Sequence, residues 1–212
     1  MTKKQQALEA ISRLEQLYPQ AECTLEYTIP HQLMIATRLA AQCTDARVNL
    51  VTPVLFTRFP TLQSLAQAEV AEVMEIVHSC GFYRTKAQDI VAACQMLLSD
   101  FGGVMPETME ELLTLPGVGR KTANLLLGDL FGKPAIVCDT HCIRITNLLG
   151  LTTGTDPAKV EQQLLPLLPP QKSNDFCHRL VMLGREICVA RRPQCDRCPL
   201  DSICKHTPKK DA

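Results

Sequence analysis

The sequence predicts an all-α fold, because helical periodicity recurs along the chain and the usual strand signals are missing. Apolar residues spaced three or four apart mark one helix face over residues 7–17 and another over residues 87–98. No run alternates apolar and polar residues, and no hairpin dipeptide joins two apolar runs. The apolar run at 135–138 could form a strand, but it has no second strand to pair with.

Helix starts can also be recognised in the sequence. Thr108 is followed three residues later by a glutamate, which is a capping box. Asp156 before Pro157 combines an N-cap residue with proline in the first turn. We expect Ser173 to cap a helix that continues to Cys188.

Length and composition bound the class of protein. The 212 residues suffice for one sizeable domain or two small ones, and 46% of them are hydrophobic. No apolar run reaches the length of a membrane span, and the N-terminus carries no secretory signal. We expect a soluble, cytoplasmic monomer without membrane contact. The formal net charge of zero counts against a nucleic-acid binder, although basic residues gather near the C-terminus.

The chain contains 11 cysteines, an odd number with uneven spacing, which argues against a disulfide scaffold. Most of the scattered cysteines have apolar neighbours and are interpreted as small buried hydrophobes. These residues are Cys23, Cys43, Cys80, Cys94, Cys138, Cys142 and Cys177.

The remaining four cysteines predict a metal centre. Cys188, Cys195, Cys198 and Cys204 fall in a polar segment that cannot bury much apolar surface, so another interaction must hold it. Structural zinc usually uses two close cysteine pairs, and only one is present here. An iron–sulfur cluster tolerates irregular spacing and is favoured, with zinc as the alternative.

Residues 110–124 predict two helices joined by a tight turn that contains Gly117 and Gly119. Backbone N–H groups of such a turn and of the following helix can hold a phosphate, with Arg120 steering toward it. The alternative is an ordinary helix C-cap without a ligand.

Two side chains near this turn are candidates for chemistry. Lys121 lies in the first turn of a helix, where the helix dipole disfavours a positive charge, and a neutral amine is suited to Schiff-base formation. A surface lysine is the alternative. Asp139 is expected to be an N-cap, and it could also be a carboxylate aimed into a cleft near Lys121.

Three motifs together resemble the endonuclease III family of helix-hairpin-helix DNA glycosylases. They are Leu-Pro-Gly-Val-Gly-Arg-Lys-Thr-Ala at 115–123, Val-Cys-Asp-Thr-His at 137–141 and Ala-Gln-Cys-Thr-Asp at 41–45. The cysteine spacing resembles the same family, and the likeness extends over nearly the whole chain.

The resemblance implies two helical lobes with a DNA cleft between them. Residues 24–134 would form a six-helix lobe with the hairpin, and residues 1–23 and 135–212 a lobe with a [4Fe–4S] cluster on the four cysteines. It implies that Lys121 is the catalytic lysine and Asp139 the catalytic aspartate.

The resemblance also implies a set of DNA contacts. Gln42 would fill the gap left by a flipped base, and Phe82, which is often leucine in relatives, would wedge into the opposite strand. The loop with Arg191 and Arg192 would touch phosphates. The full set is Gln42, Thr44, Asp45, Phe82, Gly117, Gly119, Arg120, Thr140, His141, Arg144, Arg191 and Arg192.

The implied activity is excision of oxidised pyrimidines from duplex DNA, followed by cleavage 3′ to the abasic site. Lys121 would form a Schiff base at C1′, and β-elimination would break the strand. An adenine glycosylase is disfavoured, because such relatives have a glutamate near the position of Arg38 and an extra C-terminal domain. A mismatch thymine or uracil glycosylase and a DNA-binding module without catalysis are also compatible with the motifs.

Overall fold

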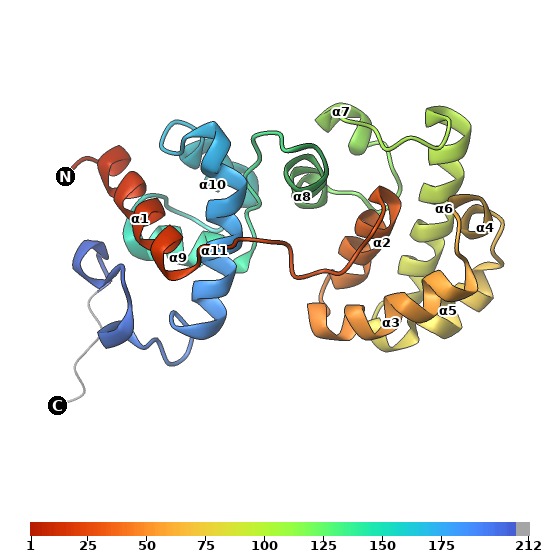
Figure 1. The fold of residues 1–212 in the computed structure, drawn as a ribbon, viewed down its shortest axis with the longest axis horizontal. Helices are drawn as coiled ribbons and strands as arrows, with labels where there is room; N and C mark the ends of the chain where they lie inside the picture. Colours follow the sequence, from red (N-terminus) through yellow and green to blue (C-terminus); the bar gives the residue numbers. More distant parts are fainter. Residues whose placement is uncertain (207–212) are drawn as a thin grey trace. The chain divides into compact units, whose positions relative to one another are not determined.

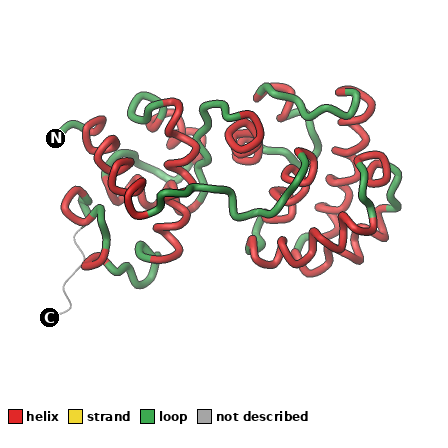
Figure 2. Tube along the Cα trace, in the orientation of Figure 1, coloured by secondary structure: helices red, strands yellow, loops and turns green. Residues whose placement is uncertain are grey.

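The structure, a computed structural model, describes residues 1–206, whose regular elements are all helices (Figure 2). The predicted all-α class is therefore confirmed. The chain divides into two compact units, coloured along the sequence in Figure 1. Unit 1 comprises Met1–Glu22 and Gly132–Ala212, and unit 2 comprises Cys23–Phe131.

Unit 1 packs the N-terminal helix against helices from the C-terminal third of the chain, with α1 against α11 and α11 against α9. The face of α1 that carries Ala7, Ile11 and Leu14 is buried as its periodicity predicts, whereas Leu17 is exposed at the helix end. The elements of unit 1 are α1 (Lys3–Leu17), α9 (Thr140–Leu149), α10 (Pro157–Leu164), η2 (Pro170–Lys172), α11 (Ser173–Glu186), η3 (Cys195–Arg197) and η4 (Asp201–Ile203).

A buried amide connects three parts of unit 1. The side-chain nitrogen of Gln6 on α1 donates to the carbonyl oxygens of Leu149, at 2.7 Å, and of Ile203, at 2.6 Å. Further along α1, Arg13 donates to the carbonyl oxygen of Pro199 at 2.8 Å. The cysteine-containing segment, which has little core of its own, is thus attached to α1.

Unit 2 is built around α6, which packs against α2, α4 and α5 and buries Ile90, Cys94 and Leu97. The predicted face over residues 87–98 is therefore the centre of this unit. Its elements are α2 (Pro30–Ala40), α3 (Asp45–Arg58), α4 (Leu62–Ala66), α5 (Val70–Val77), η1 (His78–Cys80), α6 (Tyr83–Phe101), α7 (Met109–Leu112) and α8 (Arg120–Phe131).

Two of the predicted helix starts are confirmed. The Thr108 hydroxyl accepts from the Glu111 N–H at 3.2 Å and caps α7. The Asp156 carboxylate accepts from the N–H groups of the second and third residues of the α10 turn, at 2.9 and 3.1 Å, with Pro157 in the first position.

The expected cap at Ser173 is wrong. Ser173 is the first residue of α11, and its hydroxyl donates to the carbonyl oxygen of Pro170 at 2.8 Å, because the turn η2 leads directly into the helix. The helix also ends at Glu186, two residues before Cys188. The Cys188 N–H reaches back to the carbonyl oxygen of Leu183, at 2.7 Å, and closes the last turn.

The possible strand at 135–138 does not form. These residues are buried without regular structure, and residues 1–206 offer no strand with which they could pair. None of the helices in this range has the length and apolar character needed to cross a membrane.

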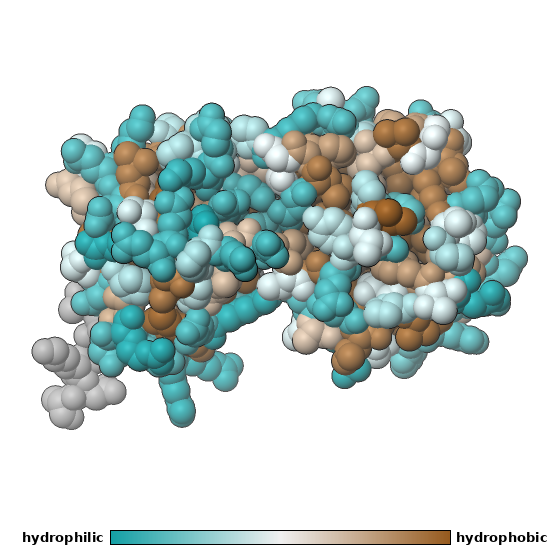
Figure 3. Space-filling model, viewed as in Figure 1, coloured by the Kyte–Doolittle hydropathy of each residue, from teal (hydrophilic) through white to brown (hydrophobic). Residues whose placement is uncertain are grey.

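On the face drawn in Figure 3, hydrophobic areas are more extensive on unit 2 than on unit 1. Exposed apolar side chains of unit 2 include Leu50, Val54 and Phe82.

The Gln6 amide generates a stability prediction. Replacing Gln6 by alanine leaves two buried carbonyl groups without their donor, and we expect the free energy of unfolding to fall by about 2 to 4 kcal/mol. Urea denaturation measures this change. Gln16→Ala on the exposed side of α1 is the control, expected to stay within about 0.5 kcal/mol of the parent protein. Equal effects of the two substitutions would contradict the proposed importance of the amide.

Candidate functional site

The predicted helix–turn–helix motif is present as α7, a turn and α8. The Val118 N–H donates to the Leu115 carbonyl at 3.0 Å, and the Ala123 N–H donates to the Gly119 carbonyl at 2.9 Å, which begins α8. Both glycines are exposed. Because N–H groups in the first turn of a helix have no acceptor within the helix, this turn presents donors to an approaching anion.

The two glycines of the turn have different physical roles. Gly117 has a φ of +75°, and a Cβ atom placed there would lie 2.7 Å from Nε of Arg38 and 2.9 Å from Cβ of Asp89. Gly119 has no positive φ, and a Cβ there would meet no atom within 4 Å. Gly117 is therefore required by the fold, whereas Gly119 borders open space.

An ion pair supports the turn within unit 2. Arg38 on α2 and Asp89 on α6 are joined by two contacts, with Nε and Nη2 of the arginine 2.7 and 2.6 Å from Oδ2 of the aspartate. Both side chains are partly buried. The pair ties α2 to α6 directly beneath Gly117, so the position of the hairpin turn depends on it.

Lys121 lies in the first turn of α8 and is exposed, one residue beyond Arg120. Its neighbours Ala123 and Asn124 are buried and anchor the helix to unit 2. The amine therefore extends from a firmly packed helix beside the glycine turn.

Gln42 and Phe82 share an unusual backbone conformation. Among the described residues they alone combine a side chain with a positive φ, 54° for Gln42 and 46° for Phe82. Both residues are exposed, Phe82 to 67%. Left-handed conformations of residues other than glycine are strained and tend to occur at functional sites. Both are residues for which the resemblance implies a contact with DNA.

Thr44 and Asp45 both have structural partners. The Thr44 hydroxyl accepts from the Arg47 N–H at 3.3 Å and caps α3. The Asp45 carboxylate accepts a hydrogen bond from the Thr24 hydroxyl. These bonds position the loop that follows Gln42.

Sequence reasoning missed Lys86, which is buried at 1% exposure on α6. Its ammonium group donates to the carbonyl oxygens of Leu39 and Cys80. The available signal was its register, because Lys86 stands four residues before Ile90 on the apolar face of the helix.

In unit 1, Asp139 is the N-cap of α9, which confirms the local role expected for it. Its Oδ1 accepts from the Cys142 N–H at 2.7 Å. The carboxylate is partly exposed, so the helix start fixes its orientation and leaves part of it accessible.

Thr140, His141 and Arg144 follow on α9. Thr140 is exposed, whereas His141 and Arg144 are partly buried. Nη1 of Arg144 donates to Sγ of Cys188 at 3.3 Å, and Nη2 lies 3.3 Å from Nδ1 of His141. Within unit 1 the guanidinium thus links α9 to the first of the clustered cysteines.

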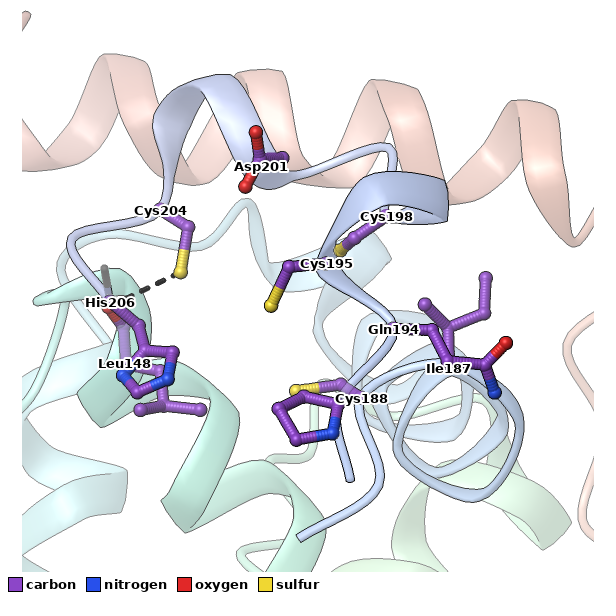
Figure 4. Close-up of a pocket in the computed structure, with 10 residues that line it drawn as sticks. Leu148, Ile187, Cys188, Gln194, Cys195, Cys198, Asp201, Cys204 and His206 are labelled. Atoms are coloured by element: carbon purple, nitrogen blue, oxygen red, sulfur yellow. Dashed lines mark hydrogen bonds between the residues drawn. The ribbon is translucent and has the colours of Figure 1, made fainter. Parts of the chain in front are cut away.

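The four clustered cysteines line one pocket of unit 1. Figure 4 shows the sulfur atoms of Cys188, Cys195 and Cys204 facing a shared space, with Cys198 beside Cys195. The Cys204 thiol donates to the carbonyl oxygen of Leu148 on α9 at 3.5 Å. Among residues 1–206, no three Cys, His, Asp or Glu side chains lie close enough together to hold a single metal ion. The thiols instead stand apart around the pocket.

Burial raises the pKa of the Cys198 thiol, and the neighbouring Cys188, Cys204 and Cys195 groups raise it further. Burial, together with the neighbouring Cys188 and Asp201 groups, also raises the pKa values of Cys195 and Cys204. Negative charges on thiolates that line one pocket repel one another, so a positively charged centre would stabilise their deprotonated forms. The donor set thus fits a thiolate-bound metal centre.

Arg191 and Arg192 are exposed on the loop between Cys188 and Cys195. The base of this loop is closed by the Gln194 N–H, which donates to the carbonyl oxygen of Ile187 at 2.9 Å. The two cations therefore stand on a short loop that the cysteine segment holds at both ends.

Comparisons with known proteins identify the family of the chain. Residues 35–170 match the family model described as HhH-GPD superfamily base excision DNA repair protein. The chain is 47% identical to Endonuclease III of Synechocystis sp. over 204 residues, covering 96% of this chain and 93% of the relative. It is 36% identical to Endonuclease III of Escherichia coli over 208 residues, covering 98% and 99%.

Solved structures are also similar to the chain. A trapped covalent Endonuclease III–DNA intermediate matches with a TM-score of 0.91 and 38% identity, covering 97% of each chain. A thermostable thymine-DNA glycosylase matches with a TM-score of 0.81 and 20% identity, covering 95% of this chain and 94% of its own. The second likeness concerns the fold alone.

The hairpin glycines give a paired prediction. Gly117→Ala forces a side chain into a positive φ and against Arg38 and Asp89, and we expect it to lower the free energy of unfolding by about 1 to 3 kcal/mol. Gly119→Ala should leave stability within about 0.5 kcal/mol and weaken binding to duplex DNA, because its methyl group would stand between the turn and a phosphate. Urea denaturation and fluorescence anisotropy measure the two effects. Unchanged DNA affinity in Gly119→Ala would argue against the phosphate-binding role.

Proposed function

The chain belongs to the endonuclease III family within the HhH-GPD superfamily of base excision DNA repair proteins, and from this we propose that its substrates are oxidised pyrimidines in duplex DNA. It is a DNA glycosylase and AP lyase that acts on damaged duplex DNA. The observation that carries the proposal is an exposed lysine in the first turn of the helix that follows a glycine turn, since N–H groups at the start of a helix suit a phosphate.

Lys121 is the proposed nucleophile. Its neutral amine attacks C1′ of the damaged nucleotide, the bond between C1′ and the base breaks, and the base leaves with the bonding electrons. Opening of the sugar ring then gives a protonated Schiff base. Removal of a 2′ hydrogen and departure of the 3′ phosphate break the strand on the 3′ side. A solved structure of a relative is a covalent DNA intermediate, which supports the same chemistry here.

Asp139 is the proposed electrostatic partner of the sugar. As the base leaves, positive charge develops on the sugar ring, and a carboxylate stabilises that charge. The hydrogen bond from the Cys142 N–H fixes one carboxylate oxygen, so the group needs little reorganisation during the reaction. It can also transfer a proton during the later steps.

Gln42 and Phe82 are proposed to open the duplex. A base inside the stack cannot present its C1′ to a nucleophile, and damage lowers the free energy required to flip it. An exposed aromatic ring can wedge between bases, and an exposed amide can occupy the vacated space. Their strained backbone conformations support this role, since such conformations persist where the surrounding structure enforces them.

The remaining contacts are proposed to hold the DNA backbone without reading its sequence. Gly117, Gly119 and Arg120 would bind phosphate at the hairpin, and Arg191 and Arg192 would do so on the cysteine loop. A contact with DNA is also proposed for Thr44, Asp45, Thr140, His141 and Arg144.

We further propose that Cys188, Cys195, Cys198 and Cys204 bind a [4Fe–4S] cluster. Four thiols spaced around a shared pocket suit a cluster in which each thiolate binds a different iron. When bound, the cluster would supply the folding energy that this polar segment lacks. The chain itself then presents Arg191 and Arg192 on a loop of fixed shape.

The adenine-glycosylase alternative is disfavoured by the surroundings of Arg38. Instead of a carboxylate, α2 carries at this position an arginine that is paired with Asp89 beneath the hairpin. The likeness to a thymine-DNA glycosylase, at 20% identity, does not favour a mismatch activity.

The central prediction concerns covalent trapping. The protein is incubated with a duplex that contains one thymine glycol, borohydride is added, and the products are separated on a denaturing gel. We expect a protein–DNA adduct with the parent protein and none with Lys121→Ala, because reduction traps only a Schiff base. Lys133→Ala is the control and should retain the adduct.

The outcomes distinguish the possible activities. Base loss that requires alkali for strand cleavage, without an adduct, would indicate a glycosylase without lyase activity. No reaction on oxidised or mismatched bases would indicate a DNA-binding protein without catalysis. An adduct that persists in Lys121→Ala would assign the nucleophile to a different residue.

A second prediction concerns the cysteines. We expect the purified protein to be brown and to contain about four irons per chain, and Cys198→Ser to lose both iron and colour. Cys23→Ala, far from the segment in sequence, should keep them. Metal analysis and the visible spectrum provide the measurement, and a colourless protein that contains zinc would overturn the cluster assignment.

A further inference from the structure

A buried lysine joins the two loops that carry Gln42 and Phe82. Lys86 on α6 is 1% exposed, and its Nζ donates to the carbonyl oxygen of Leu39 at 2.8 Å and to that of Cys80 at 2.7 Å. These acceptors belong to segments far apart in the sequence. One nitrogen atom therefore connects the end of α2 with the end of η1.

Both acceptors are carbonyl groups at helix ends. Leu39 lies in the last turn of α2, and Cys80 is the last residue of η1. Carbonyl groups in a last turn have no N–H partner within the helix and carry the negative end of the helix dipole. An ammonium group supplies hydrogen-bond donors to these carbonyl groups, and its positive charge lies at the negative end of the helix dipole.

The residues that follow these carbonyls are the ones proposed to enter DNA. Gln42 lies three residues after Leu39, and Phe82 lies two residues after Cys80. The backbone N–H of Lys86 also donates to the carbonyl oxygen of Phe82, at 3.1 Å. Lys86 thus contacts the base of the Gln42 loop through its side chain and the base of the Phe82 loop through both side chain and backbone.

Burial of the Lys86 ammonium group carries an unfavourable desolvation free energy. Burial lowers the pKa of Lys86, while the nearby Cys43 and Cys80 thiols act in the opposite direction. An apolar side chain would avoid the desolvation of the ammonium group but would leave two carbonyl groups unpaired. The lysine therefore specifies the relative position of the two loops, which an apolar core residue would not do.

We infer that Lys86 is a positioning residue that holds Gln42 and Phe82 in register for opening the duplex. This inference rests on the proposed function. The two residues act from separate loops, and their left-handed backbones are stable only when the surroundings enforce them. Within unit 2, the Lys86 side chain bonds to a carbonyl group shortly before each of these two residues.

The inference predicts a selective loss of activity. Excision of a damaged base requires the duplex to be opened and the gap to be filled, whereas an abasic site has no base to unstack. Displacing the loops should therefore impair excision more than it impairs cleavage at an abasic site. A general loss of stability would lower both activities alike.

The test compares Lys86→Met, which retains the length of the side chain and removes its donors, with Leu97→Ala. Leu97 is also buried on α6, near the opposite end of the helix, and its truncation destabilises the same unit. Single-turnover rates are measured for thymine glycol excision and for cleavage at a preformed abasic site. We expect the ratio of the two rates to fall roughly tenfold or more in Lys86→Met and to stay constant in Leu97→Ala.

Amide hydrogen exchange provides a readout independent of activity. Exchange should accelerate in Lys86→Met over both 41–44 and 81–85, and in neither segment in Leu97→Ala. If Lys86→Met does not fold, Lys86→Gln replaces it. Its side chain is one bond shorter than that of lysine and carries no positive charge, so it should lower the same ratio. An unchanged ratio, or faster exchange in one loop only, would overturn the inference.

Failure of the inference differs from failure of the proposed function. If the parent protein lacks both activities, the proposed function fails, and hydrogen exchange still reports whether Lys86 couples the loops. If the parent protein is active and the ratio is unchanged in Lys86→Met, only the positioning role fails.

Discussion

The structure depends on how the unpaired backbone groups at helix ends find partners. In unit 1, the Gln6 amide serves the carbonyl groups that end α9 and η4. In unit 2, the Lys86 ammonium serves those that end α2 and η1. At the opposite kind of terminus, Asp139 accepts from the first turn of α9. At the start of α8, the proposed partner of the first-turn N–H groups is a phosphate of the DNA.

The features that could be predicted from the sequence are those that depend on residues close together in the chain. Periodicity and capping residues identify the helices, because the partners of Thr108 and Asp156 lie within three residues. The cap expected at Ser173 is wrong because a preceding turn, which has no simple sequence signal, determines its hydrogen bond. The importance of Lys86 and Arg38 could not be predicted either, since each has a partner 47 or 51 residues away, Leu39 for Lys86 and Asp89 for Arg38, that only folding brings close.

In the candidate site too, local motifs could be predicted from the sequence and tertiary contacts could not. The glycine turn, Lys121 and the cysteine spacing are local motifs that can be recognised directly. The motif does not reveal that Gly117 is required by packing against Arg38 while Gly119 is free of such contacts. Two identical residues in one turn thus differ in their surroundings, since the first is packed against the fold and the second borders open space, and only the tertiary contacts distinguish them.

Helix α9 connects chemistry to architecture within unit 1. Asp139 caps its beginning, whereas its last turns contact the cysteine segment through the Leu148 carbonyl and the Arg144 guanidinium. A helix of ten residues is about 15 Å long and nearly rigid. A shift of the cysteine segment would therefore be transmitted to the carboxylate at the far end. Under the proposed cluster binding, this connection would link the metal centre to the orientation of the Asp139 carboxylate.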